Sequence, residues 1–155
     1  MDLETKILSK SIQELLYNSD KKIGTAESCT GGRLAEALIA VPGSSNYFNG
    51  SIIAYTNEVK ENLLGVDHQV LEEQTAVSEE VARQMVLGAI KTLRVDFAVA
   101  VTGVAGPAGG TPENPVGTIW IGYGCNTDVR TWKLSEDFGR DINLSIATSL
   151  SLIHI

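Results

Sequence analysis

Helical spacing of apolar residues marks four segments of the chain. The spacing predicts an amphipathic helix over 3–16, a second helix from Leu34 that ends before Pro42-Gly43, a third that Ser78 caps, and a closing helix. The apolar positions expected to be buried are Leu3, Ile7, Leu8, Ile12, Leu15 and Leu16 in the first helix, Val81, Met85, Ala89 and Leu93 in the third, and Ile142, Ile146, Leu150 and Ile153 in the last.

Short apolar runs between these helices predict strands. The predicted strands are 22–25, 50–55, 97–101, 116–124 and 129–134. The strand 50–55 is expected to be buried on both faces, and the last two strands are expected to form a hairpin. Thr56-Asn57 caps a short helix that ends near Gly65, and no element is predicted from there to Gln74. Helices and strands alternate early and give way to a hairpin late. The pattern predicts one α/β domain over 1–155, with a three-layer α/β/α architecture and a mixed, mostly parallel sheet.

Composition narrows the class of partner. The chain has 155 residues, which suits one domain with a sizeable core. Its net charge of −7 argues against nucleic acid, since phosphate neutralisation requires a basic surface. Two cysteines without metal-ligand spacing favour a reducing cytoplasm, and no apolar run is long enough for a membrane span. We expect a homo-oligomer that binds a small nucleotide and needs neither a metal nor another cofactor.

The stretch 26–33 places reactive residue types at a strand-to-helix turn. Ser28 would lie at the end of a strand, beside unpaired N–H groups of a helix start that suit anions and oxyanions. Gly31 and Gly32 allow a ligand to approach the backbone closely. The alternative is that the serine and threonine are helix caps and that the glycines form a turn.

Lys60 is the second candidate. In the first turn of a helix capped by Thr56, a lysine lies at the positive end of the helix dipole and gains little stability. Dipole and partial burial would lower its pKa, so that a neutral amine could take a proton from Ser28, as in known Ser–Lys pairs. Tyr55 at the strand end could relay that proton. The alternatives are that Lys60 is an ordinary surface lysine and that Tyr55 is a buried aromatic residue at a strand end.

The region from Gly103 to Pro115 is a long loop that follows a strand end, where open α/β sheets bind ligands. Cys29 is expected to be a small buried residue rather than a thiolate nucleophile, because no histidine stands beside it. His68 and His154 are isolated, and no role is assigned to either.

Several blocks resemble the CinA C-terminal-domain family, which includes stand-alone nicotinamide-nucleotide amidohydrolases. The blocks are Ala26–Gly32, Pro42–Ser45, Tyr55–Lys60, Ala76–Ser78 and Gly103–Pro107, in order along nearly the whole chain. The resemblance implies an α/β fold, with Ser28 as nucleophile, Lys60 as its base, and Tyr55 and Thr102 in support. The substrate-binding residues expected on the same ground are Thr30, Gly31, Gly32, Gly103, Gly106, Gly109, Gly110 and Arg140, the last as a partner of the substrate phosphate or, alternatively, as a surface arginine.

Two positions depart from the family's pattern. Asn114 stands where a lysine is often found, and Leu144 stands where a second arginine is often found. Two hypotheses therefore remain. The first is hydrolysis of nicotinamide mononucleotide to nicotinic acid mononucleotide and ammonia. The second is a non-catalytic nucleotide-binding or interaction domain, of the kind associated with competence and DNA damage.

Overall fold

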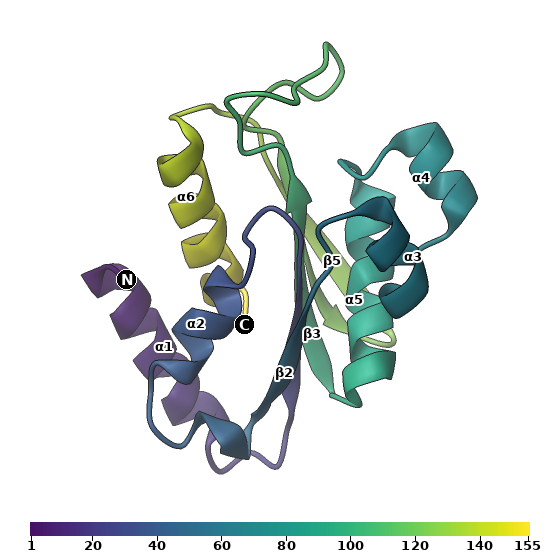
Figure 1. Ribbon diagram of the computed structural model, residues 1–155. Coiled ribbons are helices and arrows are strands. Elements are labelled where there is room, and N and C mark those ends of the chain that lie inside the picture. The colour runs from purple at the N-terminus through teal and green to yellow at the C-terminus, as the bar shows by residue number, and fades with distance from the viewer.

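The computed structural model describes residues 1–155, which form one α/β domain with a central sheet (Figure 1). The helices are α1 (Leu3–Leu16), α2 (Arg33–Ile39), the short 3₁₀ helix η1 (Ser44–Asn46), α3 (Asn57–Leu64), α4 (His68–Gln74), α5 (Glu79–Leu93) and α6 (Arg140–Ile153). The strands are β1 (Ile23–Glu27), β2 (Phe48–Ile53), β3 (Phe97–Gly103), β4 (Ile119–Cys125) and β5 (Asp128–Leu134).

The strand order in the sheet is β2-β1-β3-β4-β5. β1 pairs in parallel with β2 and β3, whereas β3–β4 and β4–β5 are antiparallel. The mixed sheet is as expected, but parallel pairings do not predominate. The predicted hairpin is confirmed, and Cys125 pairs with Asp128 across its turn.

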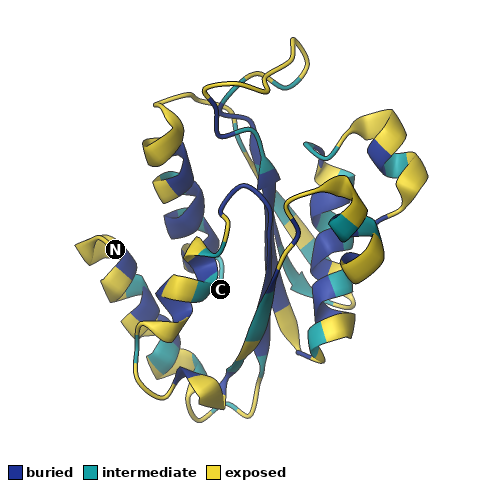
Figure 2. Ribbon diagram, in the orientation of Figure 1, coloured by how far each residue is buried: buried dark blue, intermediate teal, exposed yellow.

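Helices cover both faces of the sheet, which gives the predicted three layers. α1, α2 and α6 lie on one side, and α3, α4 and α5 lie on the other (Figure 1). Alternate residues of β3 divide between two cores: Val99 and Val101 pack with the α1–α2–α6 side, and Ala98 and Ala100 pack with the α5 side. Figure 2 shows this buried band along the sheet and along the inner side of the helices. None of the helices combines the length and the apolar character that crossing a membrane requires.

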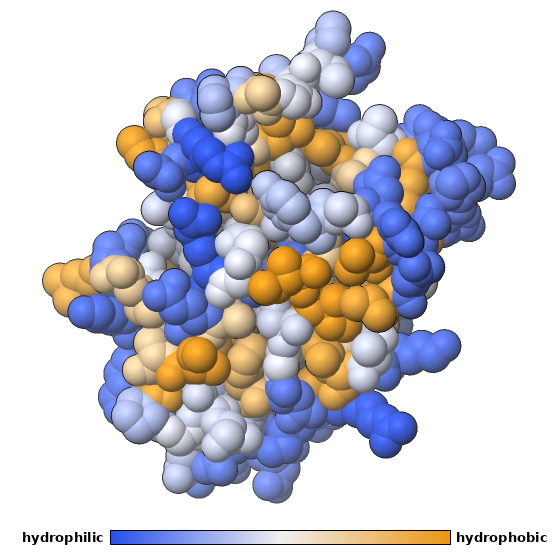
Figure 3. Space-filling view, in the orientation of Figure 1, coloured by the Kyte–Doolittle hydropathy of each residue, from blue (hydrophilic) through white to orange (hydrophobic).

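β2 is an edge strand, so the prediction that it is buried on both faces is wrong. It begins at Phe48 and ends at Ile53, whose side chain is 52% exposed. The helices converge on the central strands and leave the edge partly uncovered. Figure 3 shows an apolar area on this face of the molecule. Ile53 of β2 and Leu63 of α3 are both large apolar residues that are exposed.

The buried stripes predicted for the two terminal helices are only partly correct: Ile12 is buried, and Leu8, Leu16 and Leu150 pack against the core. Ile142 and Ile153 are each 54% exposed, and Leu3, Ile7 and Leu15 are exposed as well. The buried residues that the apolar spacing did not predict are mostly small, namely Thr5 and Ser9 of α1 and Asn143, Leu144, Ala147, Thr148, Ser149, Ser151 and Leu152 of α6.

Three of the buried hydroxyl groups, those of Ser9, Thr148 and Ser151, donate to a carbonyl four residues earlier in their own helix, which favours this packing. Ser9 donates to the carbonyl of Thr5, and Ser151 donates to the carbonyl of Ala147. A serine satisfied in this way costs little to bury and lets two helices approach closely. The spacing of apolar residues alone cannot predict a buried helix face that contains such serines and threonines.

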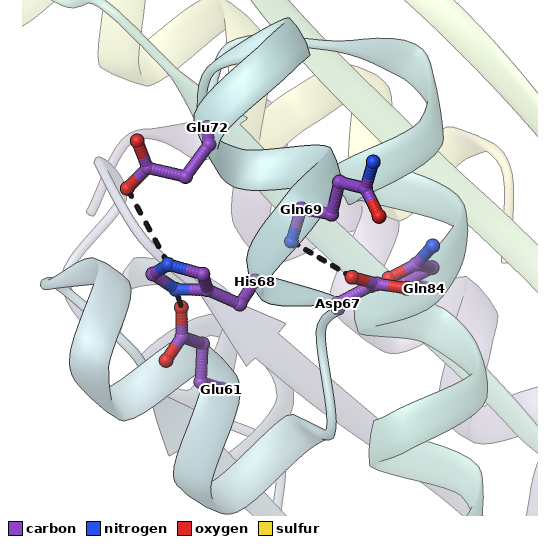
Figure 4. Close-up of polar contacts among 6 residues, drawn as sticks. All are labelled: Glu61, Asp67, His68, Gln69, Glu72 and Gln84. Atoms are coloured by element: carbon purple, nitrogen blue, oxygen red, sulfur yellow. Dashed lines mark hydrogen bonds and ion pairs between the residues drawn. The ribbon is translucent and has the colours of Figure 1, made fainter.

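α4 was not predicted, and a histidine links it to α3. His68 Nδ1 lies 2.5 Å from Glu61 Oε1 on α3, and Nε2 lies 3.7 Å from Glu72 Oε1 on α4 (Figure 4). The hydrogen bond to Glu61 raises the pKa of His68 above its usual value. This exposed cluster lies on the surface formed by α3 and α4 and ties the short helix to its neighbour.

Candidate active site

Ser28 and Lys60 meet where β1 and β2 end. Ser28 follows the last residue of β1, and its backbone N–H donates to Val101 of β3 at 2.9 Å. Lys60 lies in the first turn of α3, whose N-cap is Thr56 as predicted. Lys60 Nζ lies 2.9 Å from Ser28 Oγ and 2.8 Å from the carbonyl oxygen of Ala54. The predicted contact between the two side chains is therefore present.

Burial sets the chemistry of Lys60. Its side chain is 2% exposed, and no carboxylate forms an ion pair with it. Desolvation lowers the pKa of the amine to about 8, with a small opposing effect of Cys29. About a tenth of the amine is then neutral at pH 7, and a neutral amine in contact with a hydroxyl can accept its proton.

The helix start beside Ser28 is not the open anion site that the sequence suggested. The N–H groups of Gly32, Leu34 and Ala35 donate to the buried carboxylate of Glu27 at 2.9–3.1 Å. The hydroxyl of Thr30 donates to the same carboxylate at 2.8 Å. The Thr30 side chain is therefore not available to a substrate. Glu27 escaped the sequence analysis because an acid before a helix is an ordinary feature, and nothing in the local pattern reveals its burial.

Two N–H groups in the turn remain without a protein acceptor. They belong to Cys29 and Thr30, the two residues that follow Ser28. An N–H of the residue after a nucleophilic serine is a recurrent donor to the oxyanion in acyl transfer. The turn therefore carries a nucleophile candidate and donors for a developing negative charge.

A hollow of about 530 Å³ lies against this turn. Two arginines, Arg33 and Arg140, border it, so the hollow carries positive charge although the whole chain is acidic. The other lining residues are Cys29, Thr30, Gly31, Gly32, Glu36, Ile53 and Tyr55. Arg140 also donates to the carbonyl of Gly106 at 2.7 Å, which orients its guanidinium group. The position of Arg33 is a feature that the sequence analysis missed.

Neither Tyr55 nor Thr102 contacts Ser28 or Lys60 through a hydrogen bond. Tyr55 is 60% exposed and borders the hollow, but no hydrogen bond joins it to Ser28 or Lys60. It is neither a proton relay in this structure nor a buried aromatic. Thr102 is buried, and its hydroxyl donates to the carbonyl of Ala76 at 2.8 Å. That bond ties the end of β3 to the segment before α5.

The four glycines expected to bind substrate, at the end of β3 and in the loop that follows it, do not line the hollow. At Gly103, a Cβ atom would lie 2.6 Å from the backbone of the adjoining strand. Gly106 has a positive φ of 86°, and a Cβ there would meet the side chain of Val116 at 2.3 Å. Gly109 and Gly110 lie in the exposed part of the same loop. Close packing and loop shape therefore account for Gly103 and Gly106.

The two positions that depart from the family's pattern both lie away from the hollow. Leu144 is fully buried in the core between α1, α2 and α6, so its side chain does not face the hollow. Asn114 lies in the exposed loop, where its backbone exchanges hydrogen bonds with Thr111. Neither position borders the hollow.

Cys29 is buried, and burial raises the pKa of its thiol to about 11. The thiol is therefore protonated near pH 7, as expected for a small buried cysteine. His154 stacks at 4.6 Å from Tyr123 and contacts Trp132 away from Ser28. No group of three or more His, Cys, Asp or Glu side chains is arranged to hold a metal ion.

We expect the loop 106–114 to be mobile without ligand and to close over a bound nucleotide. Residues 107–113 are exposed, and two hydrogen bonds between Thr111 and Asn114 are the only ones within it. Amide hydrogen exchange should be fast there in the free protein and slower with ligand. Exchange that is already slow, and that the nucleotide leaves unchanged, would contradict this prediction.

A strand-to-helix turn that brings a serine and a buried lysine together, on a three-layer α/β scaffold, defines a protein with a candidate Ser–Lys site. The chain belongs to the family described as the CinA C-terminal domain, whose family model matches residues 5–154.

Known relatives share both sequence and fold with the chain. It is 42% identical over 148 residues to a CinA-like protein of Cytophaga hutchinsonii, covering 96% of this chain and 35% of the relative. A CinA-like protein of Leptospira borgpetersenii is 48% identical over 120 residues, which cover 77% of this chain and 29% of the relative. The chain thus spans about a third of the length of the curated relatives it matches.

Two crystal structures are similar over almost the whole chain. The competence/damage inducible protein CihA from Agrobacterium tumefaciens has a TM-score of 0.94 and 35% identity, covering 99% of this chain and 96% of its own. A CinA superfamily protein from Escherichia coli has a TM-score of 0.93 and 32% identity, covering 99% and 90%.

Proposed function

We propose that the chain is an amidohydrolase that converts nicotinamide mononucleotide to nicotinic acid mononucleotide and ammonia. The observation that carries the proposal is the contact of 2.9 Å between Ser28 Oγ and the buried Lys60 Nζ. A buried lysine with a lowered pKa is the base that a serine needs for amide hydrolysis without histidine.

The first half of the reaction forms an acyl-enzyme. Neutral Lys60 takes the proton of Ser28 while Oγ attacks the carboxamide carbon. The N–H groups of Cys29 and Thr30 donate to the oxyanion of the tetrahedral intermediate. Lys60 then returns the proton to the departing nitrogen, the C–N bond breaks, and ammonia leaves.

The second half repeats the proton transfers with water. Neutral Lys60 deprotonates a water molecule that attacks the acyl carbon, and the resulting intermediate collapses. The proton on Lys60 goes to Ser28 Oγ as the ester bond breaks, and the nicotinic acid mononucleotide is released. One lysine thus acts as base and acid in each half.

The choice of a nucleotide rests on the hollow beside Ser28. A phosphate needs local cations in a chain of net charge −7, and Arg33 and Arg140 supply them. The exposed ring of Tyr55 at the same hollow is suited to contact a pyridine ring. The test is release of ammonia from the mononucleotide, with Ser28→Ala as control. Binding of the nucleotide without ammonia release would support the interaction-domain hypothesis instead.

Arg140→Ala should weaken binding of the mononucleotide by about 1.5–3 kcal/mol, the usual size for a hydrogen bond to a charged group. The loss should appear mainly in KM and should largely vanish for the phosphate-free riboside. Arg130→Ala is the matched control, since Arg130 is exposed on β5 and pairs only with Asp128. Equal losses with nucleotide and riboside would contradict a contact between Arg140 and the phosphate.

A further inference from the structure

Glu27 is a fully buried carboxylate that accepts six hydrogen bonds and contacts no cation. Oε1 accepts from Thr30 Oγ1, Gly32 N and Leu34 N, and Oε2 accepts from Thr25 Oγ1, Ala35 N and Ser51 Oγ, all at 2.8–3.3 Å. Burying a charge is costly unless such donors replace water. The carboxylate therefore joins β1, the Ser28 turn, α2 and the edge strand β2 at one point.

Four other helices of this chain are capped in the ordinary way. In each, a short side chain directly before the helix accepts one N–H; these caps are Asp2, Thr56, Asp67 and Ser78. α2 differs, because its N-cap residue is Gly32 and makes no side-chain cap. The first N–H groups of α2 donate instead to the side chain of Glu27, the last residue of β1, which precedes the turn that carries Ser28.

We propose that Glu27 is a positioning residue for Ser28 and for the oxyanion donors of the turn. This inference rests on the proposed amidohydrolase function. Glu27 precedes Ser28 in the chain, and its carboxylate holds the residues where the turn ends, so it fixes both ends of the turn. By accepting the free amides of α2, it also leaves the N–H groups of Cys29 and Thr30 as the turn's unpaired donors. The substrate phosphate then depends on the two arginines and not on the helix start.

Glutamine is a sharp probe of this arrangement. Both carboxylate oxygens accept backbone N–H groups, Oε1 from Gly32 and Leu34 and Oε2 from Ala35. Whichever way a glutamine amide is turned, its NH₂ group faces an N–H donor. Glu27→Gln thus keeps the size of the side chain and disrupts the turn.

The experiment compares Glu27→Gln with Glu79→Gln, which removes an exposed acid from the first turn of α5. Kinetics of ammonia release are measured well below the melting temperature of each protein. We expect kcat of Glu27→Gln to fall by about 10²-fold with KM little changed, the size of effect that a misplacement of about 1 Å causes. Glu79→Gln should retain the kcat of the unmodified protein. A purely structural cap would lower the melting temperature and leave kcat per folded molecule unchanged, which would overturn the proposal.

A crystal structure of Glu27→Gln tests the same point without a substrate. A Ser28 Oγ displaced from Lys60 Nζ supports the proposal even if the unmodified protein releases no ammonia, in which case only the amidohydrolase function fails. A separation that stays at 2.9 Å overturns it.

If Glu27→Gln does not fold, Ser51→Ala takes its place, since it removes one donor from Oε2 and lies in β2, outside the turn. Its positioning effect should be a smaller loss of kcat at constant KM and a displaced Ser28. An unchanged kcat together with an unchanged Ser28 position in Ser51→Ala would overturn the proposal.

Discussion

Ser28→Ala is expected to abolish measurable release of ammonia from nicotinamide mononucleotide, a loss of at least about 10³-fold in kcat. Lys60→Ala should lose a similar amount. The double variant should lose no more than either single variant, because a nucleophile and its base work as a unit and removing one disables the other. The measurement is steady-state ammonia release for the three variants at one pH and one substrate concentration series.

Matched controls separate this result from a general loss of structure. Ser145→Ala and Lys91→Ala replace residues of the same types on α6 and α5, away from Ser28, and should leave kcat unchanged. Losses that add up in the double variant would show that Lys60 binds substrate rather than acting as the base of Ser28. Activity that survives Ser28→Ala but not Cys29→Ala would identify the thiol as the nucleophile, in spite of the burial that raises its pKa.

The parts of the fold and of the site that follow local rules could be predicted from the sequence. A polar turn between a short strand and a helical pattern identified the place of Ser28, and the cap at Thr56 placed Lys60 in the first turn of α3. Both rules describe backbone geometry within a few residues. The meeting of the two side chains then follows from parallel pairing of β1 and β2, whose carboxyl ends lie at the same edge of the sheet.

The features that were not predicted depend on contacts between distant segments. Ile53 and Tyr55 are exposed because β2 lies at the edge of the sheet. The local sequence does not reveal which strand is the edge strand. The buried sides of α1 and α6 include several small hydroxyl residues, whose burial depends on the neighbouring helix. Glu27 reads as an ordinary acid, because its donors come from segments as far apart as Thr25, Ala35 and Ser51. Sequence patterns therefore identify reactive residues such as Ser28 more readily than the residues that position them, such as Glu27.

The lowered pKa of Lys60 predicts a specific dependence of activity on pH. Because only the neutral amine can take a proton from Ser28, kcat/KM should rise about tenfold per pH unit at low pH and level off above pH 8. Lys60→Arg should be inactive at every pH, because arginine stays charged. A profile that levels off below pH 6 would exclude Lys60 as the base.

The same group links stability to pH, and the sign of the link can be tested with Lys60→Met. The pKa of Lys60 is about 8 in the folded protein and near 10.5 in the unfolded chain, so between these values the unfolded state binds one more proton. The free energy of unfolding of the unmodified protein should therefore rise with pH across this window, by about 3 kcal/mol in total. Lys60→Met lacks that contribution. The stability of Lys60→Met relative to the unmodified protein should be highest below pH 8 and should fall by the same amount towards pH 10.5. The lost bonds to Ser28 and Ala54 lower the stability of the variant at every pH.

The measurement is denaturant unfolding of both proteins at several pH values, because the other groups titrate alike in both and cancel in the difference. A difference that does not change with pH would mean that Lys60 titrates normally and is an ammonium ion at neutral pH, where it could not serve Ser28 as a base.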